Sequence, residues 1–138
     1  MMTKSLSTTV SIDLPHKGCI AIVASSWHKA IIDKLVEGAA RVFKTHAPST
    51  WSYELFWVPG AYELPQTCQK IAKTKCFQGI VPLGCLIKGE TSHFEWICQS
   101  VFLGLDQVAR KTGIPISNGV LTVQSEAQAH ERAGGFIE

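Results

Sequence analysis

The sequence predicts a single α/β domain, in which helices cover both faces of a mostly parallel β-sheet. Short, continuously apolar runs alternate with amphipathic segments along the chain, which is typical of strands alternating with helices. The length of 138 residues is about that of one ordinary domain. A content of 46% hydrophobic and 17% charged residues excludes an intrinsically disordered chain.

Charge and cysteine content narrow the functional class. The formal net charge of +2 is too close to zero to draw the chain onto nucleic acid or anionic lipid. The five cysteines are odd in number and form no C-x-x-C pair, which argues against a disulfide framework and a zinc knuckle. We therefore expect a reducing, cytoplasmic compartment. The uncharged stretch 76–87 is shorter than the roughly 20 residues that a membrane span needs, and residues 1–14 lack the apolar core of a secretory signal.

The N-terminal half alternates between extended and helical patterns. Apolar residues at Val10, Ile12 and Leu14 predict an extended arm, which can pair with a sheet edge of this chain or of a neighbour. The apolar run 19–24 predicts a strand buried on both faces, and either Ser25 or Ser26 can cap the helix that follows. The expected elements are an arm over 1–17, a strand over 19–24, a helix over 27–45 and a strand over 51–57.

The C-terminal half continues this alternation. Pro82 interrupts an apolar run and cannot donate to a sheet ladder, so we expect a bulge or an edge contact there. Gly113 is expected to end a long helix, and Ser125 with Gln128 forms a capping box for the last helix, which Gly134-Gly135 stops. The expected elements are helices over 65–73, 93–111 and from 125, and strands over 79–83 and 114–122.

In parallel sheets, ligands bind just past the carboxyl ends of the strands. Trp27 follows the first strand, where an exposed indole can stack on a planar ligand, although a Trp that starts an amphipathic helix is more often core. Glu63 follows the second strand and can hydrogen-bond a polar ligand, although a helix cap is the stronger interpretation of a lone carboxylate.

The third strand is followed by the segment richest in functional residue types. Glu90, Thr91 and Ser92 lead into a helix N-terminus, whose free N–H groups suit a phosphate, and simple capping by Thr91 or Ser92 is about equally favoured. His93 begins that helix, where the helix dipole disfavours the charged ring and favours a base, although a lone His is more often structural. Arg132 carries a guanidinium of the kind that clamps phosphate, although most surface arginines do not.

Five strings of residues together resemble the lumazine synthases, the 6,7-dimethyl-8-ribityllumazine synthases (riboflavin synthase β chains) of riboflavin biosynthesis. They occur in family order and at family spacing between about residues 18 and 134. The pair V-P-G-A-Y-E and G-E-T-S-H-F is highly specific. The strings are A-I-V-A-S-S-W over 21–27, W-V-P-G-A-Y-E-L-P over 57–65, L-G-C-L-I-K-G-E-T-S-H-F over 83–94, G-V-L-T over 119–122 and E-R-A-G over 131–134.

This resemblance implies a flavodoxin-like three-layer sandwich with a four-stranded parallel sheet. The implied reaction is a transferase reaction that condenses 5-amino-6-(D-ribitylamino)uracil with 3,4-dihydroxy-2-butanone 4-phosphate and releases phosphate and water. It implies no metal and no organic cofactor. The implied partners are copies of the same chain, arranged as a pentamer with active sites at subunit interfaces, and a riboflavin synthase.

The resemblance also implies a role for each matching residue. His93 matches the proton-transfer residue, and Trp27 matches the aromatic that stacks on the pyrimidine. Asn118 and Arg132 match positions supplied across a subunit interface. The implied aminouracil site is Trp27, Ala61, Tyr62, Glu63, Cys85, Leu86, Ile87 and Asn118, and the implied phosphate site is Glu90, Thr91 and Arg132.

Three features depart from the family pattern. Asn118 stands where an aromatic is common, which makes one wall of the expected pyrimidine pocket more polar. Pro82 is unusual within a family strand. The expected domain, 18–138, is short at its C-terminus for the family, so a second phosphate-side cation is expected to be absent.

Two rival interpretations stay open. The chain can be a non-catalytic ligand-binding or scaffold protein that kept the fold and lost activity with its C-terminal tail. It can also be an enzyme that uses Cys85 as a nucleophile and His93 as its base. The second rival ranks last, because Cys85 lies in an apolar run with only Lys88 as a nearby cation.

Overall fold

The computed structural model describes residues 14–134. Four strands alternate with helices along this part of the chain. In order, the elements are β1 (Gly18–Ser25), α1 (Lys29–His46), β2 (Trp51–Val58), the short 3₁₀ helix η1 (Ala61–Glu63), α2 (Leu64–Lys73), β3 (Gly79–Ile87), α3 (His93–Thr112), β4 (Gly119–Val123) and α4 (Glu126–Arg132).

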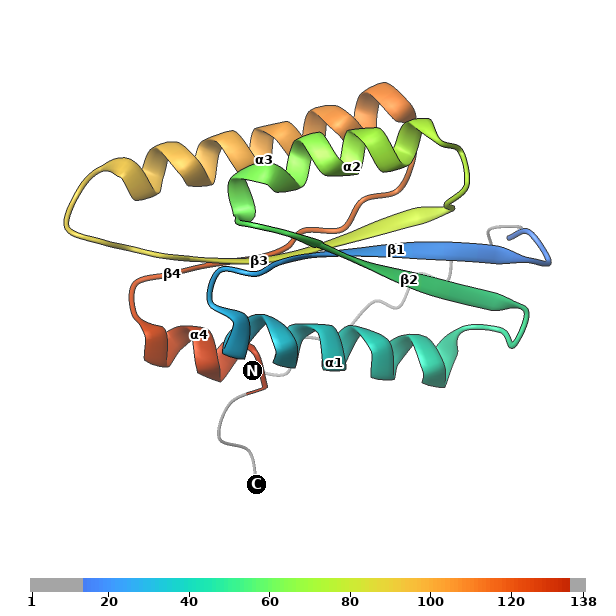
Figure 1. The fold of residues 1–138 in the computed structure, drawn as a ribbon, viewed down its shortest axis with the longest axis horizontal. Helices are drawn as coiled ribbons and strands as arrows, with labels where there is room; N and C mark the ends of the chain where they lie inside the picture. The colour runs from blue at the N-terminus through green and yellow to red at the C-terminus, as the bar shows by residue number, and fades with distance from the viewer. Residues whose placement is uncertain (1–13, 135–138) are drawn as a thin grey trace, which may run out of the picture.

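The four strands form one parallel sheet in the order β2-β1-β3-β4. Helices α2 and α3 cover one face and α1 and α4 cover the other, so the molecule has three layers (Figure 1). This arrangement confirms the expected flavodoxin-like sandwich with a four-stranded parallel sheet. All four strands run toward the same edge of the sheet, at the left in Figure 1, where β1, β3 and β4 each turn into a helix.

The core lies on both faces of β1, because successive residues of a strand point to opposite sides. Ala21 and Val23 pack among α2 and α3 residues such as Leu64. Ile22 and Ala24 pack on the other face with α1 residues such as Ile31. All of these residues are fully or almost fully buried. The continuous apolar run at 19–24 is therefore explained by burial on two faces, as the sequence predicts.

The start of α1 differs from the expectation. Neither Ser25 nor Ser26 caps the helix, whose N-cap is His28 with no side-chain capping bond. The Ser26 hydroxyl instead donates to the carbonyl of Val58 at 3.1 Å. The Ser25 hydroxyl is buried and has no hydrogen-bond partner among the described residues. The expected serine cap is therefore wrong, because Ser26 is used to tie β1 to the end of β2.

Pro82 causes neither a bulge nor an edge placement. It is buried in β3, an interior strand, and pairs in regular register with Val23 of β1. The N–H of Ile80 points toward the β4 side of the strand, where it donates to the carbonyl of Pro115. The backbone nitrogen of Pro82 points to the same side, because every second residue of a strand has the same orientation. The β3–β4 ladder begins only at Leu83, paired with Gly119, so the missing proline N–H falls in a gap of that ladder.

The same gap shortens the last strand. The expected strand over 114–122 is observed only over β4, preceded by an isolated bridge at Ile116. Gly113 ends α3 in a left-handed conformation, as expected. The Ser125 hydroxyl accepts from the backbone N–H of Gln128 at 3.2 Å, while the Gln128 side chain accepts from Gln124 rather than from Ser125. Ser125 therefore caps α4 as predicted. The return bond of the predicted capping box, from the backbone N–H to the Gln128 side chain, comes from Gln124 instead of Ser125.

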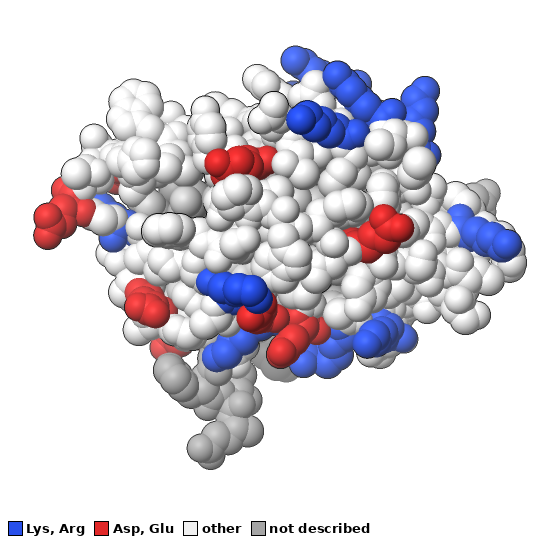
Figure 2. Space-filling view, in the orientation of Figure 1, with Lys and Arg blue, Asp and Glu red and all other residues white. Residues whose placement is uncertain are grey.

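Most of the expected N-terminal arm lies outside the described residues. Figure 2 shows basic side chains gathered over the end of α2, whose last turn carries Lys70 and Lys73. On the rest of the face that is shown, acidic and basic side chains are interspersed. Within residues 14–134, the structure has no helix that combines the length and the apolar character needed to cross a membrane.

Candidate active site

A cavity of about 370 Å³ opens at the carboxyl ends of β1 and β3. Its volume lies in the range of small-molecule sites. The lining comes from four separate stretches of the chain, the turn after β1, the turn before η1, the end of β3 and the start of α3. The lining residues are Trp27, His28, Gly60, Ala61, Tyr62, Cys85, Leu86, Ile87, Gly89, Thr91, His93, Phe94 and Ile97.

Backbone hydrogen bonds fix the β1–α1 turn against the end of β2. The N–H of Ser26 donates to Val58 at 2.7 Å, and the N–H of Trp27 donates to Pro59 at 3.1 Å. The Trp27 side chain is 69% exposed and lines the cavity. The core interpretation of Trp27 is therefore wrong, because a core indole is not largely open to solvent.

A tight turn ahead of α2 forms the second wall. Glu63 folds back so that its Oε2 accepts from the N–H of Gly60 at 3.0 Å. Glu63 is the N-cap residue of α2 but makes no side-chain bond to that helix, so its carboxylate fixes the turn instead. Ala61 packs close to Gly84 of β3, where an added Cβ would lie 3.4 Å from the Ala61 Cβ and 3.1 Å from Leu64. The glycine lets this turn sit directly on the sheet.

The end of β3 supplies apolar and backbone groups. Cys85 is buried, and this burial, with a smaller contribution from the Glu126 carboxylate, raises the pKa of its thiol to about 11. A thiol with so high a pKa is almost entirely protonated at neutral pH and is a poor nucleophile. This environment argues against the rival interpretation in which Cys85 attacks a substrate.

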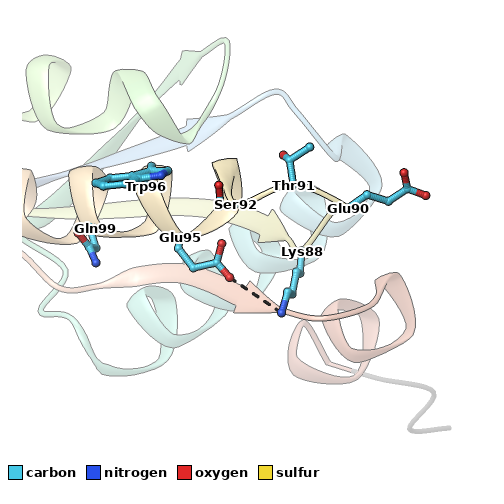
Figure 3. Close-up of a pocket in the computed structure, with 8 residues that line it drawn as sticks. Lys88, Glu90, Thr91, Ser92, Glu95, Trp96 and Gln99 are labelled. Carbon is cyan, nitrogen blue, oxygen red and sulfur yellow. Dashed lines mark ion pairs between the residues drawn. The ribbon is translucent and has the colours of Figure 1, made fainter.

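The start of α3 forms the third wall. The Thr91 hydroxyl accepts from the N–H of His93 at 3.4 Å, whereas Ser92 makes no side-chain capping bond. Thr91 also lines a second hollow of about 400 Å³, which residues 88–92 and the first turns of α3 form. Figure 3 shows that Lys88 and Glu95 point toward each other there, with Nζ and Oε1 3.9 Å apart, while Glu90 points away.

The structure brings together most, but not all, of the residues singled out from the sequence. Eight of these residues line the first cavity, and one of the eight, Thr91, lines the second hollow as well. Glu90 lines only the second hollow. Glu63 supports the turn without lining the cavity. Asn118 precedes β4, away from the carboxyl ends of the strands, and its Oδ1 accepts from the N–H of Val120 at 3.0 Å. Arg132 is exposed in the last turn of α4.

Three side chains of the cavity were not singled out from the sequence. Phe94 and Ile97 lie on the first turns of α3. Ile97 follows Phe94 by three residues and His93 by four, and this spacing is the signal that places the three residues on one side of the helix. His28 carries no comparable signal, because its position follows from an unusual backbone conformation. Within residues 14–134, no group of three or more His, Cys, Asp or Glu residues is arranged to hold a metal ion.

Comparison with known proteins gives one consistent result. Residues 17–137 match the family model described as 6,7-dimethyl-8-ribityllumazine synthase. Proteins named 6,7-dimethyl-8-ribityllumazine synthase from three Coxiella burnetii strains, CbuG_Q212, RSA 493 / Nine Mile phase I and Dugway 5J108-111, are each 40% identical to this chain over 116 residues. These matches cover 84% of this chain and 77% of each relative.

Proposed function

Because the chain belongs to the 6,7-dimethyl-8-ribityllumazine synthase family and is thus a transferase of riboflavin biosynthesis, we propose that it condenses 5-amino-6-(D-ribitylamino)uracil with 3,4-dihydroxy-2-butanone 4-phosphate. The products are 6,7-dimethyl-8-ribityllumazine, inorganic phosphate and two molecules of water. The first cavity is the proposed site of this reaction.

One observation carries this proposal. The cavity is lined jointly by Trp27, by Ala61 and Tyr62, and by the stretch from Cys85 to His93, which lie in three separate motifs of the sequence. In the proposed complex, the indole stacks on the uracil ring and the backbone groups at the end of β3 meet the uracil edge. The ribityl chain follows the turn at residues 60–63, which Glu63 stabilises through Gly60.

The phosphate of the second substrate belongs at the start of α3 in this proposal. Thr91 lies at the junction of the two hollows, so a phosphate there reaches both the helix N-terminus and the first cavity. Lys88 also lines the second hollow, but its ion pair with Glu95 offsets part of its charge. Additional positive charge is therefore needed, and Arg132 is the proposed source.

The chemistry consists mainly of proton transfers. The amine of the uracil attacks the ketone and water leaves, phosphate is then eliminated, and the second amine closes the ring with loss of the second water. Each step moves a proton between nitrogen, carbon or oxygen atoms of the substrates. His93 lines the cavity beside the proposed phosphate position and is the proposed acid and base.

A second copy of the chain completes this site in the proposal. Asn118 and Arg132 do not line the cavity of their own chain, and the proposal assigns them to the cavity of a neighbouring subunit. Strand β2 lies at an edge of the sheet, where an added strand can pair. We assign residues 1–17 as an arm that pairs with a neighbour's sheet, residues 18–138 as the domain, and a ring of five copies as the assembly. A riboflavin synthase partner stays a prediction.

The test is to supply both substrates to the purified protein and to follow lumazine absorbance and phosphate release together. The proposal requires equal amounts of the two products and none when either substrate is omitted. His93→Ala is expected to lower kcat by about 10²-fold, the low end for general acid–base catalysis, with little change in substrate binding.

The matched control is His46→Ala, at the C-terminal end of α1, which is expected to retain full activity. Binding of the aminouracil without product formation would support the non-catalytic alternative. Full turnover by His93→Ala would remove this residue from the mechanism and leave the reaction itself established.

A further inference from the structure

His28 has an unusual backbone conformation for its place in the fold. Its φ and ψ are 61° and 48°, in the left-handed region, and it is the N-cap residue of α1. A helix N-cap normally has extended backbone and a side chain that accepts from the first turn. His28 has neither property. Left-handed residues other than glycine are costly, and they gather at functional sites.

The second such residue among the described ones gives a useful comparison. Lys75 has a φ of 59° and directly follows the C-cap of α2, where its N–H donates to the carbonyl of Ala72 at 3.2 Å. Left-handed residues after helices are common, because they let the chain leave the helix. The conformation of Lys75 therefore has an ordinary explanation, whereas that of His28 at a helix start does not.

Backbone contacts hold His28 from both sides. The N–H groups of Ile31 and Ile32 donate to its carbonyl at 3.0 and 3.1 Å, and the preceding residue, Trp27, is bonded to Pro59. The imidazole lines the first cavity and lies edge-on against the Trp27 indole, with ring centroids 5.9 Å apart and an interplanar angle of 78°. The next side chain, Lys29, instead lies over Trp57 at 4.6 Å.

The Trp27 indole needs such a contact. Because it is 69% exposed, few other atoms restrict the two torsions of its side chain. We propose that His28 is a positioning residue, whose left-handed backbone turns its imidazole against the Trp27 indole and holds that indole at the cavity in the orientation that stacks on the aminouracil. This inference rests on the proposed role of Trp27.

Two substitutions separate the ring from the backbone. Asn adopts the left-handed conformation more readily than most residues but has no ring, so His28→Asn is expected to keep or raise the melting temperature. It is expected to raise KM for the aminouracil about two- to tenfold, the range of an aromatic pair, and to change KM for the butanone phosphate much less. His28→Phe keeps an aromatic ring but fits the left-handed backbone less well, so we expect a lower melting temperature with near-normal KM.

This crossed pattern distinguishes positioning from a structural role. If His28 only formed the turn, KM would worsen with loss of stability, so His28→Phe would be the poorer enzyme. Wild-type KM in His28→Asn would also overturn the inference. Lys75→Asn is the matched control, since it makes the same kind of change at the other left-handed residue and does not line the cavity. It is expected to leave both KM values unchanged.

A second readout does not depend on activity. Protein labelled with 5-fluorotryptophan has four ¹⁹F resonances, one per Trp, and Trp27→Phe identifies that of Trp27. His28→Asn is expected to shift this resonance in the ligand-free protein, while Lys75→Asn leaves it in place. An unshifted Trp27 resonance overturns the inference even if the enzyme is active. A shifted resonance in a protein that makes no lumazine upholds the positioning by His28 and refutes the proposed function.

Discussion

At the scale of single residues, the function of Trp27 depends on where its indole lies. The sequence alone favours a core position, since the residue is expected to start an amphipathic helix. In the structure α1 begins two residues later, at Lys29, and the indole lies outside the packed layer. His28, the N-cap that stands between Trp27 and the helix, has a left-handed backbone, and a backbone angle of that kind leaves no periodic trace in a sequence.

Replacement of Trp27 tests whether the indole is a stacking platform. Trp27→Ala is expected to weaken binding of the aminouracil by about 1–3 kcal/mol, a typical magnitude for stacking on a base. Affinity for the butanone phosphate is expected to change little, because its proposed site is at the start of α3. Isothermal titration calorimetry with each substrate measures both effects. Equal losses for the two ligands, or loss of folding, would contradict the stacking role.

The cysteines provide a test that uses pH. Burial raises the pKa of Cys85 to about 11, so its reactive thiolate is scarce at pH 8 and increases only as the pH approaches that value. Cys76 is exposed. Iodoacetamide at pH 8 is therefore expected to label Cys76, to spare Cys85 and to leave the activity intact, as followed by peptide mass spectrometry and turnover.

The control for this labelling is Cys76→Ser, which is expected to lose the main modified peptide and to keep full activity. Rapid modification of Cys85 at pH 8, together with loss of turnover, would restore the interpretation of Cys85 as a nucleophile.

At the scale of elements, periodicity predicts the presence and order of the helices and strands, while their ends depend on other interactions. The apolar residues of α1 recur every four positions, and β1 contains a continuous apolar run. Both are local patterns that are visible in the sequence. The start of β4 depends on Pro82 in the neighbouring strand, so no pattern within residues 114–122 predicts it. The predicted serine cap is also wrong because of a contact between distant parts of the chain, since the Ser26 hydroxyl donates to the carbonyl of Val58 in β2.

Two glycine substitutions test the packing of these elements with opposite expected signs. In Gly119→Ala the new Cβ would lie 2.5 Å from the Pro82 carbonyl oxygen, where β4 joins the sheet. Overpacking of this kind is expected to lower the free energy of unfolding by about 1–3 kcal/mol. Gly38→Ala lies inside α1, where the nearest side-chain atom is 4.0 Å from the new Cβ. Better helix propensity is expected to raise the free energy of unfolding by up to about 1 kcal/mol.

Urea unfolding of both variants and the unsubstituted protein at one protein concentration measures these effects, and the fixed concentration keeps the contribution of subunit association the same in each measurement. A Gly119→Ala variant as stable as the unsubstituted protein would contradict this prediction, because it would show that the close approach of a Cβ at residue 119 to the Pro82 carbonyl is relieved without cost.

At the scale of the whole molecule, the sequence motifs predict a larger set of site residues than the cavity of one chain brings together. The residues of the first three motifs meet at one cavity because parallel strands end at the same edge of the sheet. Asn118 and Arg132 come from the two later motifs and do not line that cavity in their own chain. The order and spacing of motifs cannot indicate which subunit's cavity a residue lines, because this depends on how the subunits pack together.

Replacement of Arg132 tests its proposed contact with the phosphate. Arg132→Ala removes a charge-assisted hydrogen bond to phosphate worth about 1.5–3 kcal/mol, so we expect KM for the butanone phosphate to rise about ten- to hundredfold. Arg132→Lys is expected to recover only part of this loss, because an ammonium lacks the bidentate fork of a guanidinium. Steady-state kinetics at fixed aminouracil concentration measure both variants.

Mixed assemblies then show which subunit supplies the guanidinium. If His93 of one copy and Arg132 of its neighbour share a site, co-expression of His93→Ala and Arg132→Ala chains creates some sites with both natural residues. Random mixing of equal amounts makes roughly one quarter of all sites intact, because each of the two contributing copies is suitable half of the time. At low butanone phosphate concentration, where each variant alone is nearly inactive, the mixture is expected to show about that fraction of the normal rate. Activity no greater than the average of the two separate variants would mean that Arg132 serves its own chain or does not contact the phosphate.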